Sequence, residues 1–484
     1  MQRRTFLTRT AVVAGGAAAL AGPFQGVAAA GELLARRGGG RPPHTPGYGP
    51  LRPVPDALDG KVRLHLPEGF GYRSFGAVGT PMSDGYATPG RHDGMAAFRG
   101  PNGSTVLVRN HEVPGVAPAF GDPALAYDPR CGGGTTTLTI DRRGRLVDDR
   151  VSINGTQMNC NGGPMPWGSW LTCEETVDGP DVKGIFPGQD NSLLTQKHGY
   201  LFEVPLHGRA RRTPIRAAGR FLHESAAYDP LGGALYLTED NFLFPSGFYR
   251  YTPPGHPERV GRLLDGGRLQ MLAIAGRPGA ELHLGQRPGA CFDVTWVDID
   301  DPDPQFAPNT PWTAAAPAVG NQGRAKGAAQ FSRLEGSIHC DGVVYFVSTQ
   351  GGATAPGDEL PPSPVPLFGA GRGQVWAYDV RRRQLRLVCE SPHSSVLDLP
   401  DNITCSPGGS LVLCEDGDGD NFLRGLTPAG RIFDIARLEP LDGDPDAEFA
   451  GATFGPSGDT LFVNIQSAQG RSFAIHGPWR GGGC

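Results

Sequence analysis

The sequence predicts an all-β chain folded as a six-bladed β-propeller with loop insertions. Its 484 residues include 73 Gly and 46 Pro, and no segment between them carries sustained helical periodicity. One unit, a short apolar strand that ends in polar residues, recurs six times. The copies are residues 105–112, 168–175, 233–240, 342–350, 409–416 and 459–466. Repetition of one supersecondary unit is typical of propellers.

The first thirty residues have the features of a twin-arginine signal peptide. Arg3 and Arg4 precede an apolar run that is rich in Ala, Val and Gly and too short for a spanning helix. Ala28, Ala29 and Ala30 form a small-residue cleavage site, so the mature chain is expected to begin near Gly31. We expect the twin-arginine translocase to export the folded protein to the periplasm or beyond, without stable membrane insertion.

The expected domain organisation is a signal peptide at 1–30, a linker at 31–60 and one propeller domain at 61–484. The linker is rich in Gly, Pro and Arg and lacks apolar periodicity. Within the domain, each repeat follows a partner strand across a Gly/Pro turn, and the partner strand adds one polar residue of its own. These polar residues are Asp93, Cys160, Glu224, Glu335, Asn402 and Glu448.

Charge and cysteine content exclude several classes of protein. The formal net charge of −5 argues against a nucleic-acid partner. The nine cysteines match no zinc-ribbon or thioredoxin spacing, so no disulfide framework is assigned. Cys173, Cys405 and Cys414 are expected to pack inside strands. Cys160 lies instead in a turn-forming segment, which favours a ligand over a packing residue.

Equivalent strands of a propeller surround one axis, so acids at equivalent positions should face one another. The acids concerned are Glu112, Glu175, Glu224, Glu239, Glu335 and Glu415. Confined like charges raise one another's pKa values, and bound cations relieve the repulsion. Carboxylates suit Ca²⁺ or Fe³⁺, whereas the Cys160 thiolate favours a transition metal, so a mixed site is predicted. The alternative for any single Glu-Asp pair is that it caps an exposed strand.

Several segments together resemble the PhoX-type alkaline phosphatases, and they cover nearly the whole mature chain. They are Asn159–Glu175, Asn110–Glu112, Thr238–Asp240, Phe331–Gly336 and Cys414–Gly417. The resemblance implies a six-bladed propeller, twin-arginine export and hydrolysis of small phosphomonoesters at a cluster of Fe³⁺ and Ca²⁺ ions. The chain is shorter than the family's best-known members, and its fourth repeat ends in Gln350 instead of an acid.

The same resemblance implies roles for individual residues. Cys160 would ligate iron, Glu239 and Glu335 would be bridging carboxylates at the catalytic site, and Arg333 would face the substrate phosphate. The remaining expected metal ligands are Glu112, Glu175, Glu224, Asp240, Glu415 and Asp416. No Gly-x-Ser-x-Gly or Walker motif supports a serine hydrolase or a nucleotide-driven enzyme.

Two other functions stay open on the sequence. A calcium-dependent propeller lactonase or phosphotriesterase would use axial acids but would need no cysteine, so metal content separates it from the phosphatase. The protein could instead be a non-catalytic propeller that binds a partner through insertions at 302–318 and 352–373. In that case, mutation of the axial acids would cause no loss of phosphatase activity.

Overall fold

The computed structural model describes residues 47–186, 188–264, 266–360, 367–417, 419–440 and 447–481. The predicted signal peptide and the first part of the predicted linker lie outside these residues. The described chain is built from strands, with short helices such as α2 (Trp312–Ala315) and α3 (Ala318–Ala325). No helix among the described residues is both long and apolar enough to cross a bilayer.

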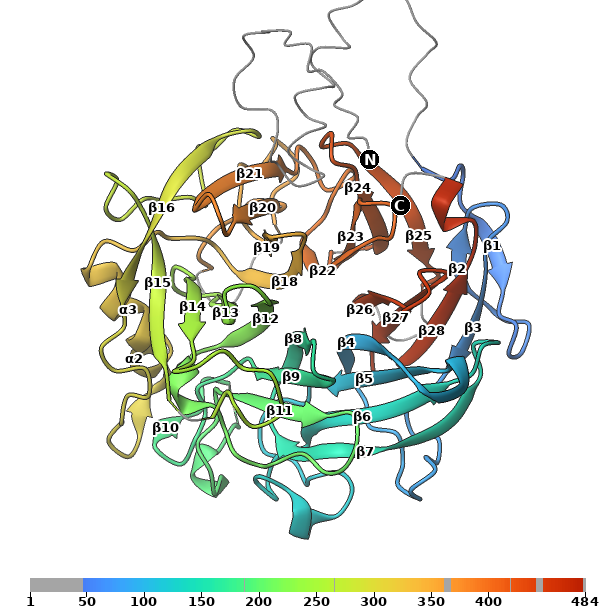
Figure 1. Cartoon of the computed structure of the whole chain (residues 1–484), viewed down its shortest axis with the longest axis horizontal. Helices are drawn as coiled ribbons and strands as arrows, with labels where there is room; N and C mark the ends of the chain where they lie inside the picture. Colours follow the sequence, from blue (N-terminus) through green and yellow to red (C-terminus); the bar gives the residue numbers. More distant parts are fainter. Residues whose placement is uncertain are drawn as a thin grey trace, which may run out of the picture.

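The sheets radiate from a common centre in a propeller-like arrangement (Figure 1). The innermost strands are β4 (His92–Arg99), β8 (Asn159–Met165), β12 (His223–Asp229), β18 (Leu334–Cys340), β22 (Pro400–Cys405) and β26 (Glu448–Phe454). Each of them contacts the next, and β26 contacts β4. The inner strands therefore form a closed ring, and the all-β, propeller-like prediction is confirmed.

Each inner strand pairs antiparallel with the strand that follows it in the sequence. These second strands are β5 (Thr105–His111), β9 (Ser169–Glu174), β13 (Ala234–Glu239), β19 (Val343–Ser348), β23 (Leu411–Glu415) and β27 (Thr460–Gln466). They coincide with the predicted repeat strands. Their apolar residues are almost all buried because they pack between neighbouring sheets.

Further strands extend the sheets outward. They are β6 (Gly133–Ile140), β7 (Leu146–Thr156), β11 (Leu201–Pro205), β14 (Phe248–Thr252), β15 (Arg268–Ile274), β16 (Cys291–Asp298), β20 (Gln374–Asp379), β21 (Gln384–Glu390), β24 (Phe422–Leu426), β25 (Ile432–Leu438) and β28 (Arg471–His476). β16 also pairs with β21, which merges two radial units into one nine-stranded sheet. A small parallel pair, β10 (Val182–Lys183) with β17 (Thr310–Pro311), lies outside these sheets.

Strands from the N-terminal end complete the C-terminal sheets and so close the ring. β3 (Gly71–Phe75) pairs with β28, and β1 (Arg52–Pro55) and β2 (Val62–Leu66) extend the sheet that contains β25. β1 lies inside the segment predicted as a linker. The buried Asp56 carboxylate anchors this segment because it binds Arg63 Nη1 at 2.6 Å and accepts hydrogen bonds from two backbone N–H groups.

Each inner strand contains an irregularity in its pairing, and it lies in the first part of the strand. All six hairpins shift register near the start of the inner strand, for example between His92 and Met95 in β4. The residues just before four of these strands have positive φ angles, which are uncommon for side chains other than glycine. They are Arg91, Met158, Arg333 and Leu399. Bulges of this kind redirect a side chain, here toward the centre of the ring.

Neighbouring inner strands pack too closely for larger side chains at some positions. A Cβ atom on Gly163 of β8 would lie 1.6 Å from the carbonyl oxygen of Ala226 in β12. Ser225 of β12 links to both neighbouring inner strands. Its Oγ donates to the Gly162 carbonyl in β8 at 3.2 Å and accepts from the Ser337 N–H in β18 at 3.0 Å. Direct contact between inner strands therefore holds the ring together.

A disulfide joins Cys340 at the end of β18 to Cys405 at the end of β22. This corrects the expectation that Cys405 is only a packing residue. The two cysteines are 65 residues apart, and only the adjacency of β18 and β22 in the ring brings them together. Cys173 and Cys414 are buried and reduced, as expected.

Gly163→Ala should destabilise the protein by about 2 kcal/mol or more, because the new methyl group meets a backbone oxygen that cannot move without shifting β12. Urea unfolding measures the change. Gly255→Ala is the control, since a Cβ there meets nothing within 4 Å. Equal midpoints for the two variants would contradict tight packing between inner strands.

Candidate metal centre

The inner strands bring one thiol and several carboxylates together at the centre of the ring. Cys160 Sγ and carboxylate oxygens of Glu175 and Glu224 lie within 4.8 Å of one another. Oxygens of Glu224, Glu335 and Asp401 form a second group within the same limit. Glu224 belongs to both groups, so they form one continuous cluster. Each inner-strand member is the second residue of its strand, at the register shift.

A second set of acids enters from the ends of the neighbouring strands. Glu112, Glu175, Asp240 and Asp416 directly follow β5, β9, β13 and β23. Glu175 shares a hydrogen bond with Asp240, and Asp416 shares one with Glu448 at the start of β26. We call the thiol and acids of both sets the central cluster. It comprises Asp93, Glu112, Cys160, Glu175, Glu224, Asp240, Glu335, Asp401, Asp416 and Glu448.

The structure places two predicted ligands, Glu239 and Glu415, outside the central cluster. Glu239 accepts hydrogen bonds from the Tyr249 hydroxyl at 2.7 Å and the Gly247 N–H at 2.9 Å. Glu415 binds Arg424 Nε at 2.7 Å. Successive residues of an extended chain point in opposite directions, so the first acid of each pair faces its own sheet and the second faces the centre.

Asp401 is a cluster member that the sequence analysis missed, because it took Asn402 as the polar residue of this strand. The signal was available in the hairpin register. Pro400 pairs with Glu415 as Asn159 pairs with Glu174, which makes Asp401 the equivalent of Cys160. Asn402 Oδ1 instead accepts a hydrogen bond from the Gly451 N–H in β26.

Burial and mutual repulsion shift seven acids of the central cluster toward their neutral forms. Burial is the main cause that raises the pKa of Glu112 to about 7 and the pKa of Asp401 to about 8. For the same reason, the pKa values of Asp93, Glu175, Glu224, Glu335 and Glu448 lie well above their usual range. Burial also raises the pKa of the Cys160 thiol. Cations at this place would favour the ionised forms.

The donor set fits bound metal ions. Glu224 Oε1 and Asp93 Oδ1 are buried without a hydrogen-bond partner among the described residues. A buried polar atom without a partner is costly, and a cation would satisfy both oxygens. Many carboxylates beside one thiol match hard cations such as Ca²⁺ or Fe³⁺ together with a transition metal.

Two arginines stand at equivalent positions on opposite sides of the ring. Arg333 precedes β18, and its Nε and Nη2 bind Asp240 at 3.0 and 2.5 Å. Its Nη2 also lies 3.0 Å from Glu335. Arg91 precedes β4 with a similar positive φ, and its charge partly offsets the raised pKa of Glu112. Arg91 was not predicted, although it shares the position of Arg333 just before an inner strand.

A cavity of about 470 Å³ opens beside the central cluster. Arg91, Glu112 and Glu175 contribute its polar side, and Phe186 and Trp312 belong to its apolar side. Trp312 is buried against Phe242, with their ring centroids 5.3 Å apart, whereas Phe186 is 60% exposed. The cavity therefore joins a charged end to an aromatic wall.

A solved structure with a TM-score of 0.63 supports the fold described above. Pseudomonas fluorescens PhoX in complex with vanadate, a transition-state analogue, aligns with a TM-score of 0.63 at 17% identity, over 90% of this chain and 98% of that chain. A gluconolactonase from Xanthomonas campestris aligns with a TM-score of 0.40 at 13% identity, over 89% of this chain and 98% of that one. A search of curated proteins found no significant match.

The sequence itself matches one protein family over most of its length. The profile described as alkaline phosphatase PhoX matches residues 46–150 and 143–469. These ranges include every member of the central cluster, together with Arg91 and Arg333. The phosphatase activity predicted from the sequence is confirmed, and the chain belongs to the PhoX family of alkaline phosphatases.

Proposed function

We propose that this phosphatase hydrolyses phosphomonoesters at a cluster of iron and calcium ions held in the centre of a six-bladed propeller. The observation that carries the proposal is that one thiol and many carboxylates meet at the centre of the closed ring of inner strands. The blade count takes each inner-strand hairpin as one blade, with the nine-stranded sheet counted as two blades joined by β16 and β21.

The members of the central cluster are the proposed metal ligands. This assignment keeps the predicted ligands Asp240 and Asp416 and leaves out Glu239 and Glu415. It adds Asp93, Asp401 and Glu448, which were not among the predicted ligands. When bound, the cations would supply Lewis acidity toward the phosphoryl oxygens and activate water. Glu239 and Glu415 would support the site by holding the neighbouring chain through their hydrogen bonds.

Arg333 is the proposed substrate-phosphate contact. Asp240 and Glu335 hold its Nε and Nη2, which leaves Nη1 without a hydrogen-bond partner within the described part of the chain. A guanidinium group fixed in this way offers a preorganised donor to phosphate oxygens. Arg91 lines the cavity together with Glu112 and would add a second positive charge.

The cavity beside the cluster would hold the organic group of the substrate. Its charged end suits the phosphate, and its aromatic wall suits an apolar or aromatic alcohol. We therefore propose that small aryl phosphomonoesters are better substrates than short alkyl ones. The substrate would meet the enzyme outside the cytoplasm, since Arg3 and Arg4 support export by the twin-arginine route.

Purified exported protein should contain iron and calcium and should be coloured, because thiolate bound to Fe³⁺ absorbs visible light. Cys160→Ser should remove the absorption band and most phosphatase activity while far-ultraviolet circular dichroism stays unchanged. Cys389→Ser, which removes another buried thiol, is the control. A colourless, iron-free enzyme with full calcium-supported hydrolysis would favour the lactonase or phosphotriesterase alternative.

Arg333→Ala should reduce turnover of an aryl phosphate about a hundredfold, the scale of losing one preorganised donor to a developing charge. Metal content, measured by mass spectrometry, should stay nearly constant. Arg268→Ala removes a surface arginine that pairs with Asp298 and should leave turnover unchanged. Loss of metal in step with activity would show that Arg333 supports the cluster and does not bind substrate.

Phe186→Ala should lower kcat/KM for an aryl phosphate about fivefold to tenfold, since roughly 1 kcal/mol of aromatic contact is lost. The value for a short alkyl phosphate should not change. Leu231→Ala removes a similarly exposed apolar side chain away from the cavity and serves as the control. Equal losses for both substrates would place the organic group elsewhere.

A further inference from the structure

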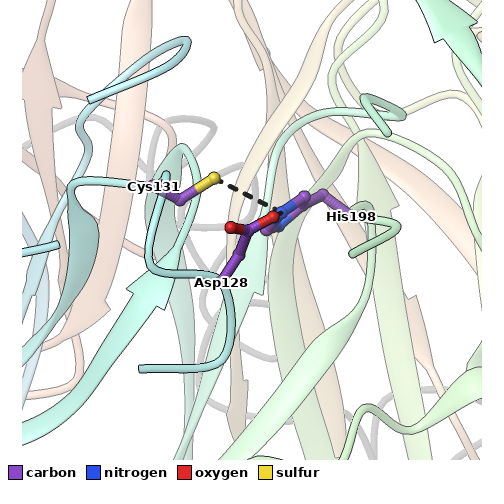
Figure 2. Close-up of side chains that lie close together, drawn as sticks. All are labelled: Asp128, Cys131 and His198. Atoms are coloured by element: carbon purple, nitrogen blue, oxygen red, sulfur yellow. Dashed lines mark hydrogen bonds and ion pairs between the residues drawn. The ribbon is translucent and has the colours of Figure 1, made fainter. Parts of the chain in front are cut away.

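A second cluster of metal-ligating side chains lies away from the central cluster (Figure 2). Asp128 and Cys131 come from the segment before β6, and His198 comes from the segment before β11. All three side chains are fully buried. Cys131 Sγ lies 3.3 Å from His198 Nε2, and Asp128 Oδ2 lies 3.6 Å from the same nitrogen. Three donor atoms of different chemistry therefore converge on one point.

The Glu174 carboxylate fixes the orientation of the His198 ring. Its Nδ1 lies 2.7 Å from Glu174 Oε1, and Glu174 Oε2 accepts hydrogen bonds from the N–H groups of Gly199 and Tyr200 at 2.9 and 3.2 Å. Because Nδ1 donates to Glu174, Nε2 is directed toward Cys131 and Asp128. A carboxylate behind a histidine is the arrangement that sets the tautomer and direction of metal-ligating histidines.

Backbone hydrogen bonds also fix the position of the Asp128 carboxylate. Its Oδ2 accepts hydrogen bonds from the N–H groups of Thr195 and Gln196 at 2.7 and 2.9 Å, and its Oδ1 accepts one from the N–H group of Arg130 at 2.9 Å. The Tyr127 ring packs edge-on against His198 with a centroid distance of 5.5 Å. The three donors thus stand on backbone that is already ordered, as a preformed site requires.

We propose that Asp128, Cys131 and His198 bind a structural Zn²⁺ ion that joins the segments before β6 and β11. Thiolate, imidazole and carboxylate are the ligands that zinc uses, at distances of about 2.0–2.3 Å. Tetrahedral ligands at those distances are about 3.3–3.6 Å apart, which matches the observed separations from His198 Nε2. Asp128 offers two oxygens, so a bidentate carboxylate would complete four donor atoms.

Complete burial makes this a structural site and not a catalytic one, because substrate cannot reach it. The ion would tie residues of two adjacent sheets, since β6 belongs to the sheet of β4 and β11 to the sheet of β8. Glu174 orients His198 while its neighbour Glu175 joins the central cluster. The competing arrangement has no metal and uses a protonated His198 as the cation between Glu174 and Asp128.

The test uses the full chain with Cys160→Ser, so that the central thiol cannot contribute a signal. After dialysis against a weak chelator, this protein should retain about one zinc ion per chain. After its zinc is removed with a strong chelator, the same protein should take up Co²⁺ and show a thiolate-to-cobalt absorption band. Adding Cys131→Ser should abolish both signals, whereas adding Cys389→Ser, the matched buried thiol, should preserve them.

Thermal unfolding supplies a second measurement that does not depend on the cobalt spectrum. Zinc addition to the metal-stripped protein should raise the Tm of the Cys160→Ser chain and of its Cys389→Ser derivative, and should raise that of the Cys131→Ser derivative clearly less. A folded Cys160→Ser chain without zinc and without the cobalt band would overturn the proposal. Equal zinc content with and without Cys131 would overturn it too. Neither readout uses phosphatase activity, so the result is separate from the proposed function.

Discussion

Closure of the ring of inner strands is the constraint on which the site depends. β26 contacts β4, and β3 from the N-terminal end completes the sheet of β28, so no inner strand can move outward alone. Closure brings the starts of the inner strands around one point. Contacts as tight as Gly163 against Ala226 maintain this geometry, and the carboxylates at the centre are crowded as a direct result.

The crowding explains both the electrostatics and the chemistry of the centre. Buried acids such as Asp401 hold their protons to higher pH than usual, because burial and their neighbours oppose ionisation. Cations would reverse this preference and create a strongly polarising site for phosphate. The arginines before β4 and β18 share a positive φ angle, and each places a positive charge near an acid of the cluster: Arg91 near Glu112 and Arg333 near Glu335.

The paired acids at the strand ends serve two purposes, because consecutive side chains of a strand point in opposite directions. Glu175 belongs to the central group of donors and Asp240 is its hydrogen-bond partner, while Glu174 and Glu239 bind side chains and backbone of their own sheets. Glu174 thereby orients His198 in the proposed zinc site. One short sequence motif thus connects the central cluster to the packing of the surrounding loops.

The sequence alone determined the all-β class, the repeat strands, the family and most of the central acids, because period and composition are local properties. It did not decide which member of the Glu239–Asp240 and Glu415–Asp416 pairs faces the centre, since a shift of one residue reverses the direction of every side chain. Asp401 in place of Asn402 follows from the register shift in β22. Glu239 and Glu415 turn away from the centre because side chains alternate along an extended strand. Only the closed ring brought Cys340 to Cys405 and His198 to Cys131, because those contacts join residues 65 and 67 positions apart.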